Sequence, residues 1–124
     1  MKKTEPVPYE ALERIFHEPN RFSILSALCA SDEPLSFTQI KQGCNLTDGN
    51  LNRHLKALQE EGVIRMDKAF VDLKPRTTIR LTAKGLDRFR DYLVALGDVL
   101  KSARKAVPAR HKAGWAVSGR RAEA

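Results

Sequence analysis

The stretch from residue 46 to residue 64, LTDGNLNRHLKALQEEGVI, restricts the fold of this chain more than any other part. Three leucines recur in it at helical intervals: Leu51, Leu55 and Leu58. They share one side of an α-helix, which we expect to face a core. Thr47 can cap this helix, because its hydroxyl can accept a hydrogen bond from a free N–H of the first turn. Gly62 is suited to end it. The stretch therefore predicts a short helix that packs against other helices through one side.

The opposite side of this helix is polar and partly basic. At about 100° per residue, it carries four residues: Gly49, Asn52, Arg53 and Lys56. Asp48 lies in the first turn, where a negative charge suits the helix dipole. Asn and Arg side chains have the hydrogen-bonding groups that recognise base edges in the major groove of DNA. The pattern suggests a helix that contacts DNA bases, and the segments on either side of it provide further evidence.

The segments before this helix are expected to supply its partners. A short helix is expected at 9–16, and Glu18-Pro19 resembles the start of another that runs to about residue 28. After a break at 31–34, Thr38 can cap a short helix that ends at Gly43. Two helices joined by a tight turn, the second with a polar outer face, form a helix-turn-helix.

Two segments of alternating pattern follow, at 64–70 and 77–81, and are separated by a break at 72–75. They predict a β-hairpin whose tip carries Lys74 and Arg76. A positively charged hairpin beside a helix-turn-helix is a wing, placed to contact the phosphate backbone or the minor groove.

Thr82 can cap a last, long helix that runs to about Ser102. Five apolar residues on it follow spacings of three and four: Leu86, Phe89, Leu93, Leu96 and Leu100. This spacing is that of a coiled-coil seam. We expect the stripe to pair with a second copy of the chain, and the alternative is that it packs only on its own domain.

The length of 124 residues fits one domain with short extensions. We expect a flexible lead-in at 1–8, a folded domain at 9–104 and a basic tail at 105–124 that contains Trp115. The fold class is mainly α with a small β-hairpin (α+β). No apolar run approaches a membrane span, and the start of the chain, MKKTEPVPYE, lacks the apolar segment of a signal peptide. We therefore expect a cytoplasmic protein with no membrane partner.

Charge is distributed unevenly along the chain, whose formal net charge is +7. Residues 1–64 hold seven Lys and Arg against nine Asp and Glu, whereas residues 65–124 hold fifteen against six. A basic second half favours a polyanionic partner, nucleic acid before membrane. Charge alone fits equally well with a surface that only keeps a small protein soluble.

No pattern of catalytic or metal-ligating residues stands out. His17, His54 and His111 are scattered, and His54 lies beside the leucine stripe, where a half-buried packing role is expected. Cys29 and Cys44 form no CxxC pair and are expected to be free, buried thiols. We expect no enzymatic activity, no metal and no cofactor.

With these elements in order, the chain resembles the stand-alone winged-helix transcriptional regulators of the MarR/ArsR-like superfamily. Two motifs carry the resemblance: LTDGNLNRHLKAL at 46–58 and KPRTTIRLTAKG at 74–85. The resemblance implies a winged helix-turn-helix with a C-terminal dimerisation helix. It also implies a homodimer that binds a pseudo-palindromic operator in double-stranded DNA, most often as a repressor. In many relatives a cleft between the dimer helix and the DNA-binding core holds a small-molecule effector, and no residue here identifies one.

Carried over residue by residue, the resemblance places one set of side chains against DNA: Thr38, Gln39, Thr47, Asp48, Gly49, Asn50, Asn52, Arg53, Lys56, Lys68, Lys74, Arg76 and Thr77. Arg53 is expected to contact a guanine or a phosphate, and Asn50 and Asn52 an adenine or the backbone. Thr38 and Gln39 are expected to hold a phosphate through backbone N–H groups. The first and last helices are expected to form the dimer interface through eight residues: Leu12, Ile15, Phe16, Leu86, Phe89, Leu93, Leu96 and Leu100.

Two other functions are compatible with the same sequence. A winged helix can serve as a protein-interaction module without specific DNA binding, since fold alone does not decide function. The basic outer face of residues 49–60 argues against that alternative. A redox switch through Cys29 or Cys44 would require a lowered thiol pKa and access to solvent.

Overall fold

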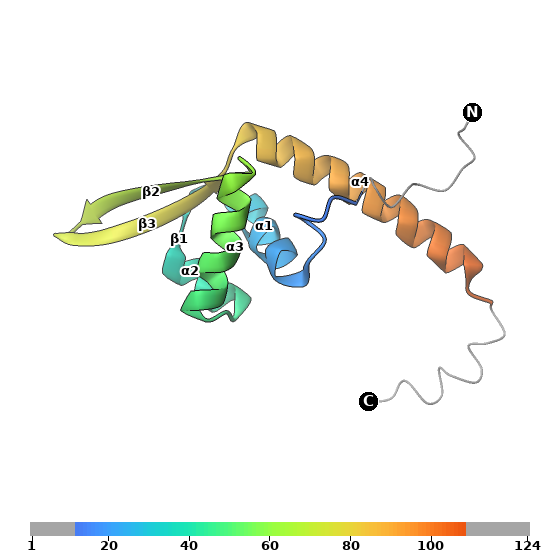
Figure 1. The fold of residues 1–124 in the computed structure, drawn as a ribbon, viewed down its shortest axis with the longest axis horizontal. Coiled ribbons are helices and arrows are strands. Elements are labelled where there is room, and N and C mark those ends of the chain that lie inside the picture. Colours follow the sequence, from blue (N-terminus) through green and yellow to red (C-terminus); the bar gives the residue numbers. More distant parts are fainter. Residues whose placement is uncertain (1–11, 109–124) are drawn as a thin grey trace.

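The structure is a computed structural model that describes residues 12–108. Its elements follow in the order α1 (Pro19–Ala30), β1 (Leu35–Ser36), α2 (Phe37–Cys44), α3 (Asp48–Glu60), β2 (Ile64–Val71), β3 (Lys74–Leu81) and α4 (Ala83–Ala106). The first three helices gather in one group, the β2–β3 hairpin projects to one side of it, and α4 extends to the other side (Figure 1). The predicted fold class, mainly α with a β-hairpin wing, is confirmed.

The sheet has one more strand than the hairpin alone. The strand order is β1-β3-β2, and both pairings are antiparallel. The two residues of β1 pair with Thr78 and Ile79 of β3, which joins the base of the wing to the start of α2. The wing therefore projects from a fixed base.

The core forms where the helices meet the base of the wing. The predicted leucine stripe of α3 is fully buried. It packs with apolar residues from the other elements, among them Ile24, Leu25, Ile40, Val63, Ile79 and Phe89. None of the helices within residues 12–108 has the length and apolarity needed to cross a membrane.

The segment before α1 differs from the prediction. Residues 12–18 form a turn rather than the end of a helix at 9–16, and Phe16 N donates to Glu13 O at 3.1 Å. The turn directs Phe16 into an aromatic cluster, where its ring centroid lies 5.7 Å from that of Phe89 and 5.5 Å from that of Tyr92. Residues 9–11 lie outside the described part of the chain.

The helix starts are set by side-chain caps, three of them as predicted. Glu18 caps α1, whose first residue is Pro19, and the Glu18 side chain accepts from Arg21 N at 2.7 Å. Thr47 caps α3 and Thr82 caps α4. The cap of α2 is Ser36 rather than Thr38, because Ser36 and Gln39 form a reciprocal capping box: Ser36 Oγ accepts from Gln39 N at 3.1 Å, and Gln39 Oε1 accepts from Ser36 N at 2.8 Å. The helix consequently begins one residue before Thr38.

The remaining predictions about the ends and the thiols are only partly tested. Helix α4 runs to Ala106, past its predicted end at Ser102. The lead-in at 1–8, His111, Trp115 and the rest of the tail beyond residue 108 lie outside the described residues. Both cysteines are free, but Cys29 is exposed and Cys44 is only half-buried, so the expectation that they are buried was wrong.

Candidate nucleic-acid interface

The outer face of α3 is accessible, as the sequence predicted. Six of the seven predicted positions in and before this helix are exposed: Thr47, Asp48, Gly49, Asn52, Arg53 and Lys56. Asn50 is half-buried, and its backbone N–H donates to the hydroxyl of Thr47 at 3.2 Å. A Cβ atom added at Gly49 would meet no other atom within 4 Å. This part of the helix therefore presents an open surface to a partner.

An ion pair that the sequence analysis did not identify holds the start of α3. Lys41 Nζ of α2 lies 2.7 Å from Asp48 Oδ1. Both side chains are exposed, so the pair stabilises the fold only slightly. Its larger effect is local: Lys41 neutralises the acidic residue nearest to the predicted reading face, which would otherwise repel phosphates. The sequence signal was present only as opposite charges on either side of the predicted turn.

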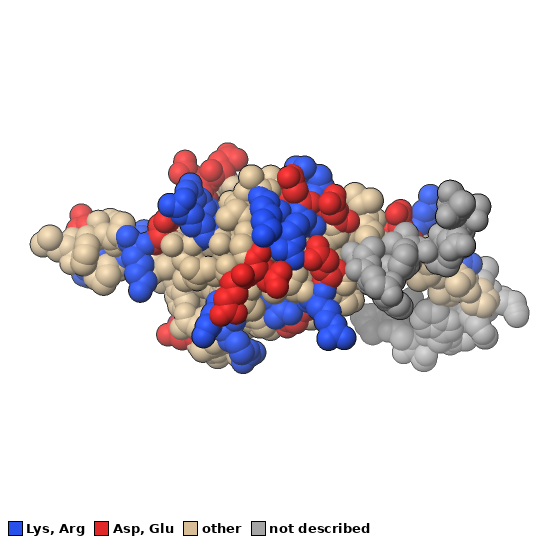
Figure 2. All heavy atoms as spheres, turned by 45° about the horizontal axis from the view of Figure 1, so that its top comes forward, with Lys and Arg blue, Asp and Glu red and all other residues tan. Residues whose placement is uncertain are grey.

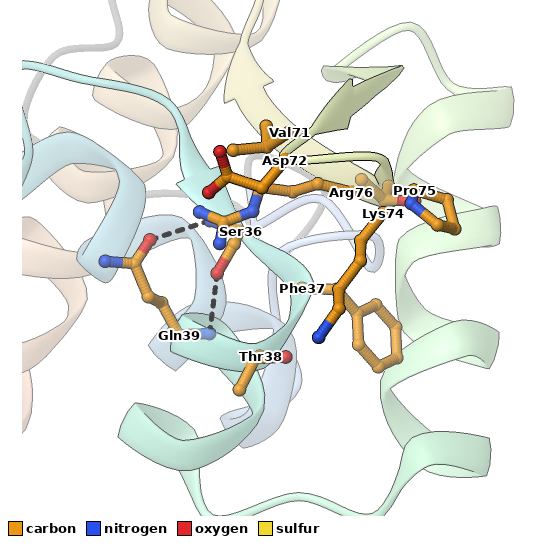
Figure 3. Close-up of a pocket in the computed structure, with 10 residues that line it drawn as sticks. Ser36, Phe37, Thr38, Gln39, Val71, Asp72, Lys74, Pro75 and Arg76 are labelled. Atoms are coloured by element: carbon orange, nitrogen blue, oxygen red, sulfur yellow. Dashed lines mark hydrogen bonds between the residues drawn. The ribbon is translucent and has the colours of Figure 1, made fainter.

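A groove runs between the start of α2 and the wing, with a volume of about 780 Å³. It brings together predicted contact residues that are more than thirty positions apart in the sequence: Thr38, Gln39, Lys74, Arg76 and Thr77. Figure 3 shows Lys74 and Arg76 reaching from the wing over the start of α2. The groove thus combines a helix N-terminus with two cationic side chains, Lys74 and Arg76, and one acidic side chain, Asp72. The net positive charge of this lining favours an anion.

The structure corrects one detail of this predicted phosphate site. The backbone N–H of Gln39 already donates to Ser36 Oγ within the capping box. It is therefore not free for a phosphate, and the amide oxygen of the same side chain is also engaged. Thr38 is exposed at the second position of the helix and stays a candidate.

The wing is longer than predicted, and its tip is different. Strands β2 and β3 extend to Val71 and Lys74, so the connecting turn consists of Asp72 and Leu73 alone. Lys74 and Arg76 lie within β3, opposite Val71 and Ala69. The predicted break at Pro75 is absent, because Pro75 lies within β3 at a position where that strand pairs with β2 only. The predicted basic tip is thus correct for Lys74, which borders the turn, whereas Arg76 lies two residues farther along β3. The large exposed side chains at the tip are apolar.

The other predicted wing residues lie along the same ribbon. Lys68 of β2 is exposed and pairs with Thr77 of β3, which is half-buried. Two further arginines, Arg65 and Arg80, lie opposite each other near the base and both approach Asp67, at 3.2 and 3.9 Å. Because Asp67 already pairs with them, they contribute less free positive charge than Lys68, Lys74 and Arg76.

His54 is buried in the middle of α3, more completely than the sequence suggested, with 4% of its surface exposed. Its Nδ1 lies 3.3 Å from Arg21 Nη1 of α1, while its Nε2 is buried without a hydrogen-bond partner. Burial lowers the pKa of His54, and the carboxylate of Glu18, 4.0 Å from Nε2, partly opposes that effect. His54 is thus a neutral packing residue on the buried side of α3, next in sequence to Arg53 on the exposed side.

The predicted dimer interface divides into two groups. Leu12, Phe16 and Phe89 are buried in the protomer's own core, because the turn at 12–18 packs against α4. They therefore do not form part of a surface that a second copy can reach. Ile15 and Leu96 are half-buried, and the remaining three residues are exposed by 38–49%: Leu86, Leu93 and Leu100.

The helix-turn-helix of α2 and α3, the wing, and the accessible basic face between them define a winged-helix DNA-binding fold. The family model described as a winged helix DNA-binding domain matches residues 20–100, so the chain belongs to that family. An uncharacterized protein from Methanocaldococcus jannaschii is 36% identical over 89 residues, which cover 72% of this chain and 96% of that protein.

Solved structures show the same fold. The transcriptional regulator homologue protein from Pyrococcus horikoshii OT3 has a TM-score of 0.69 and 28% identity, and the match covers 76% of this chain and 93% of that one. Sco3205, a MarR family transcriptional regulator from Streptomyces coelicolor solved in complex with DNA, has a TM-score of 0.62 and 19% identity, over 84% of this chain and 72% of that one. The fold of the chain is that of MarR-like regulators.

Proposed function

We propose that this winged-helix DNA-binding protein is a homodimeric transcriptional regulator that occupies a pseudo-palindromic operator, most simply as a repressor. The observation that carries the proposal is the exposed outer face of α3, with Asn52, Arg53 and Lys56 on one accessible surface. In this arrangement α3 enters the major groove, where Arg53 can donate two hydrogen bonds to one guanine. The open surface at Gly49 allows the helix to approach the groove edge closely.

The wing and α2 complete the proposed contact. Lys68, Lys74 and Arg76 meet phosphates on either side of the wing, and Thr38 holds a phosphate at the start of α2. These contacts set the position of the protein on the duplex, while α3 reads the sequence. The proposed location is the cytoplasm, where the chain acts as a binding protein without enzymatic activity.

An effector site is a further part of this proposal. An apolar cleft of about 250 Å³ lies between α1 and α4, and its lining includes Phe22, Tyr92 and Leu96. A small apolar molecule held there would contact both the helix that supports α3 and the helix proposed to dimerise. Binding could thus change the spacing of the two reading helices.

The test is selection of bound sequences from random duplex DNA, followed by titration of wild type and Arg53→Ala by fluorescence anisotropy. We expect a two-fold-related sequence with half-sites about one helical turn apart, and a loss of roughly tenfold or more in affinity for Arg53→Ala, since a bidentate base contact contributes about 1–3 kcal/mol. The matched control is Arg90→Ala, which removes the same charge from an exposed position on α4.

The salt dependence separates specific from general attraction. Affinity should fall steeply as salt rises, because each neutralised phosphate releases a counterion. If Arg53→Ala and Arg90→Ala weaken binding equally and no sequence is selected, the chain binds DNA only through its net charge. The protein-interaction module would then be the better description.

A further inference from the structure

The tip of the wing carries large apolar side chains that nothing in the described structure covers. Phe70 is 77% exposed and Leu73 is 94% exposed, and Val71 and Pro75 beside them are exposed as well. Figure 2 shows the projecting end of the hairpin as largely uncharged, with both acidic and basic side chains bordering it. An exposed apolar cluster at one point of a small protein usually marks a site of interaction.

Leu73 also has an unusual backbone. Asp72 and Leu73 both have positive φ values, +53° and +67°, as a two-residue hairpin turn of type I′ requires. Asn-Gly and Asp-Gly are the sequences preferred in such turns, because a Cβ atom is unfavourable in the left-handed region. A leucine at the second position is thus strained and, with its side chain in solvent, gains nothing from packing. A strained backbone at a residue whose side chain does not stabilise the fold points to a function for that side chain.

The position of the tip agrees with a contact to DNA. Leu73 lies six positions before Ile79, the one buried residue of β3, so the tip projects about 20 Å from the base of the wing. Lys74 lies at the tip itself, next to Leu73, and Lys68 and Arg76 lie just behind it, on the two strands. The two-stranded ribbon is too wide for the minor groove, which is about 6 Å wide, but the two-residue turn at its end is narrow enough to enter. The cations on both strands would then lie near the phosphates that line the groove.

The two apolar side chains both lie near the end of the hairpin. Phe70 pairs with Pro75 across the strands, on the hairpin face that also carries Ile64 and Ile79. That face is turned toward the helical body at its base, since Ile64 and Ile79 are buried there. Phe70 therefore lies near the tip, on the face of the ribbon that is turned in the same direction as the core.

We propose that Leu73 is a wedge that enters the minor groove of bound DNA and partly unstacks one base step, with the exposed ring of Phe70 close by in the chain. This proposal rests on the proposed function, because it requires duplex binding through α3. Apolar wedges of this kind unstack base pairs and kink the duplex. The wing would then contribute to sequence preference through the ease of deforming a step, in addition to its phosphate contacts.

The test uses the selected operator with 2-aminopurine placed in turn at the base steps that flank the half-sites bound by α3, because the fluorescence of this base rises when it is unstacked. A fluorescent donor and acceptor at the two ends of the duplex report bending. Leu73→Gly is the informative variant, since Asp-Gly is a preferred turn sequence and the hairpin should be kept or stabilised. With wild type we expect raised 2-aminopurine fluorescence at one step per half-site and a bent duplex. With Leu73→Gly we expect both signals to be lost and the affinity to fall about tenfold, the value of burying one leucine side chain.

Two variants serve as controls. Lys74→Ala should weaken binding and reduce the slope of log K against log salt by about one while keeping the 2-aminopurine signal. Leu73→Gly removes no charge and should leave that slope unchanged. Val71→Thr, on the opposite face of the ribbon and nearly the same size, should change neither signal.

The outcomes are distinct. Sequence-specific, Arg53-dependent binding with no fluorescence change at any step, or with full signal in Leu73→Gly, overturns the wedge and leaves the proposed function standing. The apolar tip would then be a surface for a protein partner. If wild type binds no duplex specifically, both proposals fail.

Discussion

At Gly85, in the first turn of α4, the helix backbone lies directly against the backbone that leaves α3. A Cβ atom added there would be 2.0 Å from Val63 O, which no side-chain movement can relieve. Thr82 holds the same junction, because its hydroxyl donates to Gly62 O at 2.7 Å and accepts from Gly85 N at 2.8 Å. The spacing of threonine and glycine in LTAKG is thus explained by close packing between two backbones.

We predict that Gly85→Ala lowers the free energy of unfolding by about 3 kcal/mol or more, because backbone must move to accept the methyl group. Urea unfolding followed by circular dichroism measures this. The matched control is Gly97→Ala, also in α4, where an added Cβ meets nothing within 4 Å. That change should stabilise the protein by roughly 0.5–1 kcal/mol, since alanine favours the helix. Similar effects in both variants would contradict the packing argument.

Protonation of His54 should destabilise the fold. Burial lowers the pKa of His54 in the folded protein below its ordinary value of 6.5, so the unfolded chain binds the proton more readily. Stability from this group is therefore complete above about pH 6.5 and is lost as pH falls through the lower, folded pKa.

The measurement is the free energy of unfolding between pH 7.5 and pH 5, for wild type and His54→Gln. The decline toward acidic pH should be smaller in the variant, since other titrating groups act on both proteins alike. If the two curves run parallel, His54 is not the source of the dependence. An NMR titration of the imidazole would show the folded pKa directly.

At the level of elements, the parts specified by neighbouring residues were predictable. The cap, stripe and end of α3 all come from residues within one short segment, and α4 likewise starts at its predicted cap. Prediction from neighbouring residues was less reliable where two residues could serve the same role. Both Ser36 and Thr38 can cap a helix, and only Ser36 has a glutamine three residues later that completes the box. In the wing, Pro75 suggested a break, and nothing local showed that leucine would occupy a left-handed turn position.

Contacts between distant residues could not be predicted. Arg88 of α4 joins three segments: its Nη2 lies 2.6 Å from Glu13 Oε1 and 3.0 Å from Glu61 Oε1, and its guanidinium lies over the ring of Phe16, 5.5 Å from the centroid. These contacts seat the turn at 12–18 against α4. The sequence stripe that suggested a dimer seam therefore mixed residues used for this internal packing, such as Phe16 and Phe89, with residues that stay exposed.

For the whole molecule, the second half of α4 extends beyond the core of the protomer. Its buried residues all precede Leu96, and farther along the helix only Leu96 and Val99 are partly covered. Exposed apolar residues remain along α4 and at its C-cap: Leu93, Val94 and Leu100 on the helix, and Val107 directly after it. An isolated helical segment of this length is marginal in water without packing, and Figure 1 shows it extending away from the helical group. A second copy that packs on this stripe would bury these residues. It would also fix the two DNA-binding wings at a set distance from each other.

We predict that Leu93→Asp combined with Leu100→Asp converts a dimer into a monomer, as measured by sedimentation equilibrium. Affinity for a duplex with two half-sites should fall by about 100-fold or more, because the second half-site is no longer held near the first. Affinity for a single half-site should change little, since α3 and the wing lie on the other side of the molecule.

The control is Lys101→Asp, which places the same acidic residue at an exposed position next to Leu100. It should preserve the dimer, because a lysine beside the apolar stripe contributes little to its burial. If the leucine variant remains a dimer and keeps its preference for paired half-sites, the interface must lie elsewhere, and the exposed stripe on α4 would have to be covered by a different partner. If the leucine variant instead becomes a monomer that binds paired half-sites as tightly as wild type, the two winged-helix domains bind DNA independently. In that case α4 joins the two copies without setting the distance between the half-sites of the operator.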